Sequence, residues 1–292
     1  MSKSKVYFSK EITPEALKKV YHAMGVELKG RVAVKISTGE PGGHNFLQPA
    51  LIEGLVTELD GTIVECNTAY AGRRDTAAAH WKSIEEHGFL AIAPCDIMDE
   101  DGEMASPVEG GSHLKENFVG EHLKNYDSML MLSHFKGHAM GGFGGALKNM
   151  SIGVASSHGK VWIHTSATSE KFEDAFTADH DSFLESMADA DKSVMDFMGR
   201  EHIVYVNVAN RLSVDCDCDA HPHDPEMADI GIFASTDPVA LDQACVDAVY
   251  QSPDEGKAAL IERIESRNGI HTVEAAAALG LGSREYELVT CI

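Results

Sequence analysis

The sequence is short of basic residues: 24 Lys and Arg stand against 46 Asp and Glu, so the formal net charge of the 292-residue chain is −22. Proteins that bind nucleic acid through its phosphates, or that dock on anionic lipid, carry a surplus of Lys and Arg instead. We therefore expect no nucleic acid and no membrane surface among the partners of this protein.

Long apolar runs are also missing, because no stretch approaches the roughly 18 to 20 residues that a membrane-spanning helix needs. The stretch from Met1 to Glu15 lacks the apolar segment of a secretory signal. The six cysteines are too sparse for a disulfide scaffold. Together these absences predict a cytoplasmic protein.

The chain alternates short apolar stretches with helical ones. Strands are predicted at 6–8, 32–36, 62–66, 89–93, 129–133, 203–208, 230–234 and 287–290. Helices are predicted at 14–24, 51–59, 75–87, within 169–198, at 238–250, and twice more before the last strand. This alternation is typical of βαβ units, so we expect an α/β fold with a mainly parallel or mixed sheet flanked by helices. No linker is visible, and a single domain over residues 1–292 is expected, although two lobes would also fit.

In such sheets, ligands bind outside the carboxyl ends of the strands. Polar loops follow Ile36, Cys66, Ser133 and Val208, at the ends of four predicted strands. The functional site is therefore expected where these loops meet.

A glycine-rich loop is predicted after the strand at 129–133, with five glycines in residues 137–145. Glycine lets a backbone approach a ligand closely, and such a loop can direct N–H groups at an anion that Lys136 and Lys148 would neutralise. The spacing is neither a Walker loop nor a dinucleotide fingerprint, and a tight loop packed on the sheet is an alternative. The residues assigned to a cofactor or anionic ligand are Gly141, Gly142, Gly144, Gly145, Lys148 and Asn149.

The segment 215–224, DCDCDAHPHD, contains two cysteines, two histidines and four aspartates. Sulfur and nitrogen are ligands that zinc and iron prefer. Acidic neighbours raise thiol pKa values unless a cation offsets them, so the grouping favours a bound metal. An exposed acidic loop with incidental thiols is the alternative.

Two further segments have both a functional and a structural interpretation. His164 ends a short apolar run and is either a ligand or a structural histidine. Arg73 and Arg74 follow a strand and suit a carboxylate or phosphate, although ordinary loop capping explains them as well. Asp237, followed by Pro238, is predicted to cap a helix.

Four segments resemble the domain of unknown function 362 family, whose members are described as uncharacterised iron–sulfur centre proteins. In order along the chain they are VAVKISTGEPGGHNFLQP, LSHFKGHAMGGFGGALKNMSIGVAS, DCDC and DIGIFASTDPVALDQACVD. The residues that match the family are His134, His138, Lys148, Asn149, His164, Cys216, Asp217, Cys218 and Asp237. The resemblance implies no agreed reaction.

One departure from the family is informative. Many relatives carry a ferredoxin-like insert with Cys-x-x-Cys-x-x-Cys spacing after the position of His164, but here no cysteine occurs between His164 and Cys216. A ferredoxin-type 4Fe–4S cluster is therefore not supported. The glycine-rich segment is also similar to a short region of nickel-dependent lactate racemases, which supports ligand binding there and not racemisation.

Three hypotheses follow. The first is a redox or metal-assisted enzyme for a small anionic substrate, in which iron or zinc is held by Cys216, Cys218, His134, His138 and His164. His138 and Lys148 are its expected catalytic residues. The second is an enzyme with a phosphate-bearing or nucleotide-like cofactor at the glycine loop, and the third is a non-catalytic metal carrier or sensor. A homodimer could form through the last strand.

Overall fold

The computed structural model describes residues 3–291. Its α-helices are α1 (Pro14–Ala23), α2 (Pro49–Glu58), α3 (Ala77–Glu86), α4 (Ala146–Val154), α5 (Ser157–His164), α6 (His180–Met198), α7 (Pro238–Gln251), α8 (Lys257–Ser266) and α9 (Ile270–Ala278). Its strands are β1 (Ser4–Ser9), β2 (Val32–Lys35), β3 (Thr62–Glu65), β4 (Cys95–Ile97), β5 (Glu103–Pro107), β6 (Glu116–Gly120), β7 (Ser128–His134), β8 (Lys136–His138), β9 (Gly142–Gly144), β10 (Ile203–Ala209), β11 (Gly231–Ser235) and β12 (Tyr286–Thr290).

A mixed sheet forms the centre of the fold, with the strand order β12-β1-β11-β10-β7-β2-β3-β4. Strand β11 is antiparallel to both of its neighbours, and the remaining pairs are parallel. The expected α/β fold with a mainly parallel or mixed sheet is confirmed. Because β2, β3, β7 and β10 point the same way, their carboxyl ends lie at one edge of the sheet.

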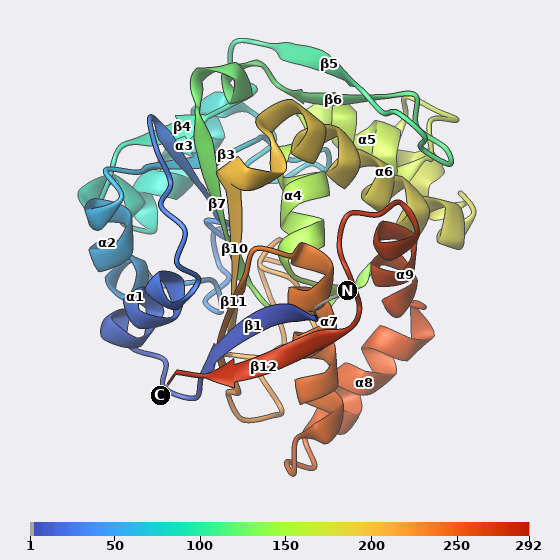
Figure 1. Ribbon diagram of the computed structural model, residues 1–292. Helices are drawn as coiled ribbons and strands as arrows, with labels where there is room; N and C mark the ends of the chain where they lie inside the picture. Colours follow the sequence, from blue (N-terminus) through green and yellow to red (C-terminus); the bar gives the residue numbers. More distant parts are fainter. Residues whose placement is uncertain (1–2, 292) are drawn as a thin grey trace.

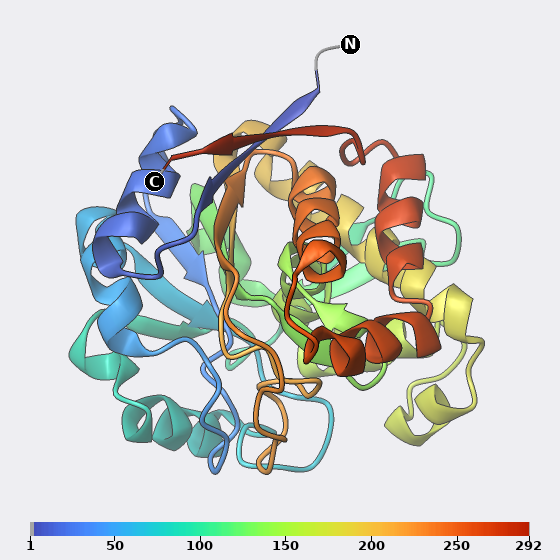
Figure 2. The ribbon, with the colours of Figure 1, turned by 90° about the horizontal axis from the view of Figure 1, so that it is seen from below.

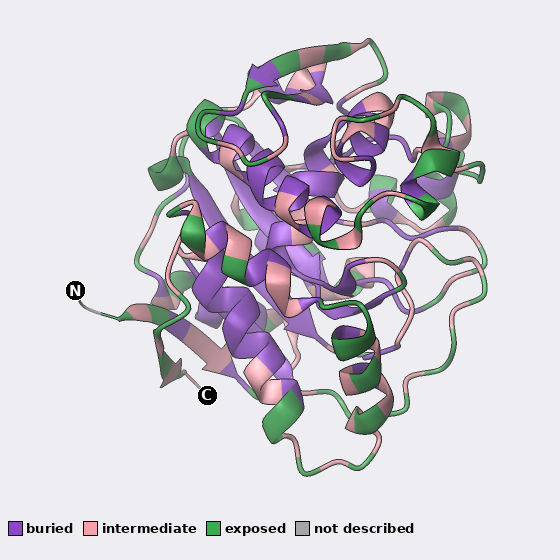
Figure 3. Ribbon diagram, turned by 90° about the vertical axis from the view of Figure 1, so that its right-hand side faces the viewer, coloured by how far each residue is buried: buried purple, intermediate pink, exposed green. Residues whose placement is uncertain are grey.

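Helices cover both faces of this sheet. Figures 1 and 2 show α1, α2 and α3 on one side, and α4, α6, α7 and α9 on the other. Along β7, Met129 and Met131 pack into the core under the second group, while Leu130 and Leu132 pack under the first. Every residue of β7 is buried, as Figure 3 illustrates for the centre of the sheet, because a central parallel strand is covered on both faces.

Two predicted segments differ from the structure. The predicted strand at 89–93 is wrong: Phe89–Ala91 forms a 3-10 turn after Gly88 at φ 83°, and the edge strand is β4. The predicted glycine-rich loop is largely a small hairpin, in which β8 pairs with β9. Both segments contain a turn, and the pattern of apolar residues does not reveal where that turn lies.

Asp237 caps α7, as predicted. Its Oδ1 accepts a hydrogen bond from the Ala240 N–H at 2.9 Å, and Pro238 occupies the first helical turn. Among the described residues, no helix combines the length and the apolar character that crossing a membrane requires.

Candidate metal and anion site

A pocket of about 280 Å³ lies at the carboxyl ends of β2, β3 and β7. Its cationic lining residues are Lys35, Arg74, Lys136, Lys148 and Lys160. Its thiol and imidazole residues are Cys66, Cys216, Cys218, His134, His138 and His164. The loops that follow separate strands therefore meet, and a chain with a large negative charge gathers positive side chains in one cavity.

The loop that contains the two cysteines is tied to the end of β7 by Asp217. Its Oδ1 accepts a hydrogen bond from His134 Nδ1 at 2.8 Å, and its Oδ2 lies 3.1 Å from Lys136 Nζ. Burial raises the pKa of Asp217, but the charges of His134 and Lys136 outweigh this effect and hold it below its usual value. This buried contact places Cys216 and Cys218 against the pocket.

His138, Cys216 and Cys218 form the one group of potential metal ligands found among residues 3–291, with ligand atoms within 4.8 Å of one another. The Cys218 N–H also donates to Cys216 Sγ at 3.3 Å. The side-chain hydrogen bond from Cys218, and then the charges of His138 and Lys148, hold the pKa of Cys216 well below its usual value. The same hydrogen bond raises the pKa of Cys218.

His138 and His164 both line the pocket, but they carry the ring proton on different nitrogens. Nδ1 of His138 accepts hydrogen bonds from the N–H groups of Met140 at 3.1 Å and Gly141 at 2.9 Å, so Nε2 carries the proton of the neutral ring. Nδ1 of His164 instead donates to the Lys160 carbonyl at 2.6 Å, which leaves the Nε2 lone pair free. Burial lowers the pKa of His138 to about 4 and that of His164 to about 3, so both rings are neutral at pH 7.

His134 lines the pocket but is not part of the ligand group. Its Nδ1 donates to Asp217, and its Nε2 donates to the Asn210 carbonyl at 2.6 Å. Neither ring nitrogen is left for an ion in this arrangement. The residue instead positions the cysteine loop.

The predicted glycine residues divide in a similar way. Gly144 and Gly145 line the pocket, whereas Gly141 supplies an N–H group to His138. The first N–H groups of α4, at Ala146 and Leu147, donate to the buried Asp242 carboxylate at 2.8 and 3.0 Å. A protein carboxylate thus already occupies the anion position at this helix start, while Lys148 and Asn149 on the first turns of α4 face the pocket.

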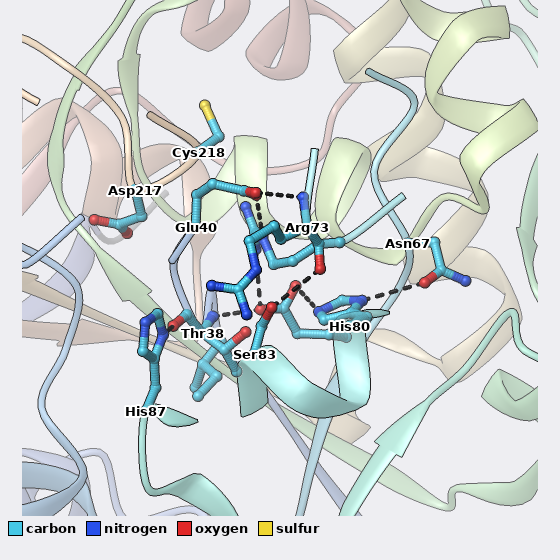
Figure 4. A network of polar contacts seen from close by, with 12 residues as sticks. Thr38, Glu40, Asn67, Arg73, His80, Ser83, His87, Asp217 and Cys218 are labelled. Atoms are coloured by element: carbon cyan, nitrogen blue, oxygen red, sulfur yellow. Dashed lines mark hydrogen bonds and ion pairs between the residues drawn. The ribbon is translucent and has the colours of Figure 1, made fainter. Parts of the chain in front are cut away.

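The arginine loop after β3 is held by carboxylates of the protein. Arg74 Nε donates to Glu40 at 3.0 Å, and its other nitrogens reach Glu65 at 3.5 Å and the Tyr70 hydroxyl at 3.1 Å. Figure 4 shows Glu40, the neighbouring Arg73 and the adjacent cysteine loop with Asp217 and Cys218. This network braces one wall of the pocket, and the guanidinium of Arg74 is committed to it.

Two residues of the site were not identified from the sequence. Lys35 ends β2 and Lys160 lies on α5, and both are buried with their ammonium groups at the pocket. Lys35 is the only charged residue of its strand, VAVK, which is a weak signal of a role beyond packing.

Comparison with solved structures gives matches of low sequence identity. The lactate racemase apoprotein from Thermoanaerobacterium thermosaccharolyticum matches with 12% identity and a TM-score of 0.49, over 84% of this chain and 57% of that one. A structural-genomics protein from Thermotoga maritima matches with 14% identity and a TM-score of 0.48, over 81% of this chain and 58% of that one. This chain thus spans less than two thirds of either protein.

Comparison with curated protein sequences gives no significant match. The model of the domain of unknown function DUF362 matches residues 32–247, a range that contains every residue of the pocket described above. Because this range is well over half of the sequence, the chain belongs to the DUF362 family.

Proposed function

We propose that this protein is a metal-dependent enzyme for a small anionic substrate, with zinc or iron held by Cys216, Cys218 and His138. The observation that carries the proposal is the convergence of two sulfurs and one imidazole within 4.8 Å in the pocket. Three protein ligands with one open position are the usual arrangement of a catalytic zinc site.

The donor set fits such an ion. Ligand atoms around one tetrahedral zinc lie about 3 to 4 Å apart, so a limited contraction of the present cluster would suffice. Nε2 is the nitrogen of His138 that would hold the ion, and for this its proton would have to move to Nδ1, which now accepts two backbone hydrogen bonds. When bound, the metal would polarise a substrate oxygen or lower the pKa of a bound water.

Two other side chains complete the proposed chemistry. Lys148 lines the pocket and has no ion-pair partner within residues 3–291, so its ammonium group can hold a substrate carboxylate or phosphate. His164 is neutral and has a free Nε2 lone pair, which suits it to accept a hydrogen bond from a substrate hydroxyl or a bound water. His138, in contrast, serves as a ligand or as a proton donor to Cys216.

A non-catalytic metal carrier would have the same ligands. The cavity of about 280 Å³ and the lysines that line it favour an enzyme, because a carrier needs no room for a small anion beside its ion.

Elemental analysis of protein purified without air tests the metal site. Wild type should contain about one zinc or iron per chain, and Cys216→Ser, Cys218→Ser and His138→Gln should each lose most of it. Cys291→Ser is the matched control, since Cys291 lies beside the edge strand β12 and not at the pocket. Equal metal content in wild type and in the two cysteine variants would remove the sulfur ligands and the proposal with them.

A further inference from the structure

Lys35 is a buried cation at the end of the central strand β2. Only 2% of the residue is exposed. Its Nζ donates to the Ile36 carbonyl at 2.6 Å and to Asn149 Oδ1 at 3.2 Å. An ammonium group has three N–H donors, so one remains for a group inside the pocket.

Lys160 reaches the same cavity from α5. It is 7% exposed, and its Nζ donates to the Ala155 carbonyl at 2.5 Å. Its other two N–H groups have no partner among the described residues. Lys160 and His164 are one helical turn apart, so they lie on the same face of α5 and both line the pocket.

Within residues 3–291, no carboxylate lies within ion-pair distance of either ammonium group. The acids that attract these ammonium groups are already engaged. Glu65 accepts from Arg74 and from the Thr38 N–H, and Asp99 accepts from Asn67 and the Ser157 N–H. Burial outweighs the attraction of these acids and lowers the pKa of Lys35 to about 8, and it lowers the pKa of Lys160 as well.

The helix α4 leaves room for Lys35. A Cβ atom at Gly153 would lie 2.9 Å from Lys35 Nζ, so a larger residue there would displace the ammonium group. Asn149, one turn earlier, orients it from the same helix. Two buried ammonium groups without a carboxylate partner lower the stability of the folded protein. A bound anion would offset this cost, which is why we expect these two lysines to bind one.

We propose that Lys35 and Lys160 form an oxyanion subsite that binds a carboxylate or phosphate group of the substrate. This subsite shares no residue with the group formed by His138, Cys216 and Cys218. It rests on the proposed function and deepens it, because it implies a substrate that carries an oxyanion group in addition to the group that would face the metal.

Calorimetric titration with inorganic phosphate and with succinate tests this subsite. The proteins to compare are wild type, Lys35→Met and Lys160→Met, with Lys82→Met on the exposed part of α3 as the control. Each pocket variant should weaken binding of the preferred anion by about tenfold or more, and the control should bind like wild type. The tighter of the two anions identifies the substrate group as phosphate or carboxylate.

Repeating the titrations in a Cys216→Ser background separates this inference from the metal proposal. In this background, weaker anion binding by the lysine variants, at the same metal content as the Cys216→Ser parent, supports the subsite even if the metal ligands prove different. Equal binding in wild type and Lys160→Met, or no binding of either anion by wild type, would overturn it. Lys160→Met decides the matter alone if Lys35→Met does not fold.

Discussion

Asp217 Oδ1 lies 2.8 Å from His134 Nδ1, across 83 positions of the sequence, and both side chains are buried. Asp217 stands between Cys216 and Cys218, whereas His134 ends β7. This one contact, supported by Lys136, fixes the cysteine loop against the strand ends. His134 can therefore shape the site without binding a metal, because its ring holds the cysteine loop in place.

Replacing Asp217 by Asn should disturb both stability and metal binding. The substitution leaves Lys136 buried without its carboxylate, which should cost about 3 kcal/mol in the free energy of unfolding. Metal content should fall as well, although all three proposed ligands remain. Denaturant unfolding and elemental analysis measure the two effects.

Asp224→Asn is the matched control, because Asp224 is exposed on the same loop. It should change the free energy of unfolding by less than about 0.5 kcal/mol. If Asp217→Asn also kept wild-type stability and metal content, the contact with His134 and Lys136 would not be what positions the loop.

Coordination by His138 should loosen the turn that follows β8. A metal at Nε2 requires the ring proton on Nδ1, where the N–H groups of Met140 and Gly141 now donate. Amide hydrogen exchange at these two residues should therefore be faster in metal-loaded protein than in metal-free protein. Unchanged exchange would show that His138 donates a proton to Cys216 instead of binding the ion.

Much of this arrangement could be predicted from the sequence. Apolar stretches such as 129–133 are long enough to identify strands, and the rule that ligands gather at strand ends correctly brought segments near His134 and Cys216 together. The strand at 89–93 was misplaced because a 3-10 turn has no apolar period of its own.

Other features depend on contacts that a sequence pattern does not contain. The partners of His134 come from Asn210 and Asp217, and the N–H groups of α4 meet Asp242 from α7. The role of Lys35 depends on its burial. Lysine is usually exposed, so the sequence does not indicate that this one is buried.

The buried charge of Lys35 should make stability depend on pH in the alkaline range. Its pKa is about 8 in the folded protein against 10.5 in an unfolded chain, so unfolding takes up a proton between these values. The wild-type free energy of unfolding should therefore rise, relative to that of Lys35→Met, by up to about 3 kcal/mol between pH 8 and 10.5.

Denaturant unfolding of the two proteins across this pH range measures that difference, and other titrating groups cancel in the comparison. A difference that stays constant with pH would mean that Lys35 keeps an ordinary pKa and is not an unpaired buried cation.

X-ray absorption at the metal edge of protein purified without air tests the central claim most directly. The account predicts two sulfur neighbours at about 2.3 Å and, for zinc, a nitrogen neighbour at about 2.0 to 2.1 Å, with the sulfur signal lost in Cys216→Ser/Cys218→Ser. A bound metal surrounded only by oxygen and nitrogen in the wild-type protein would contradict it.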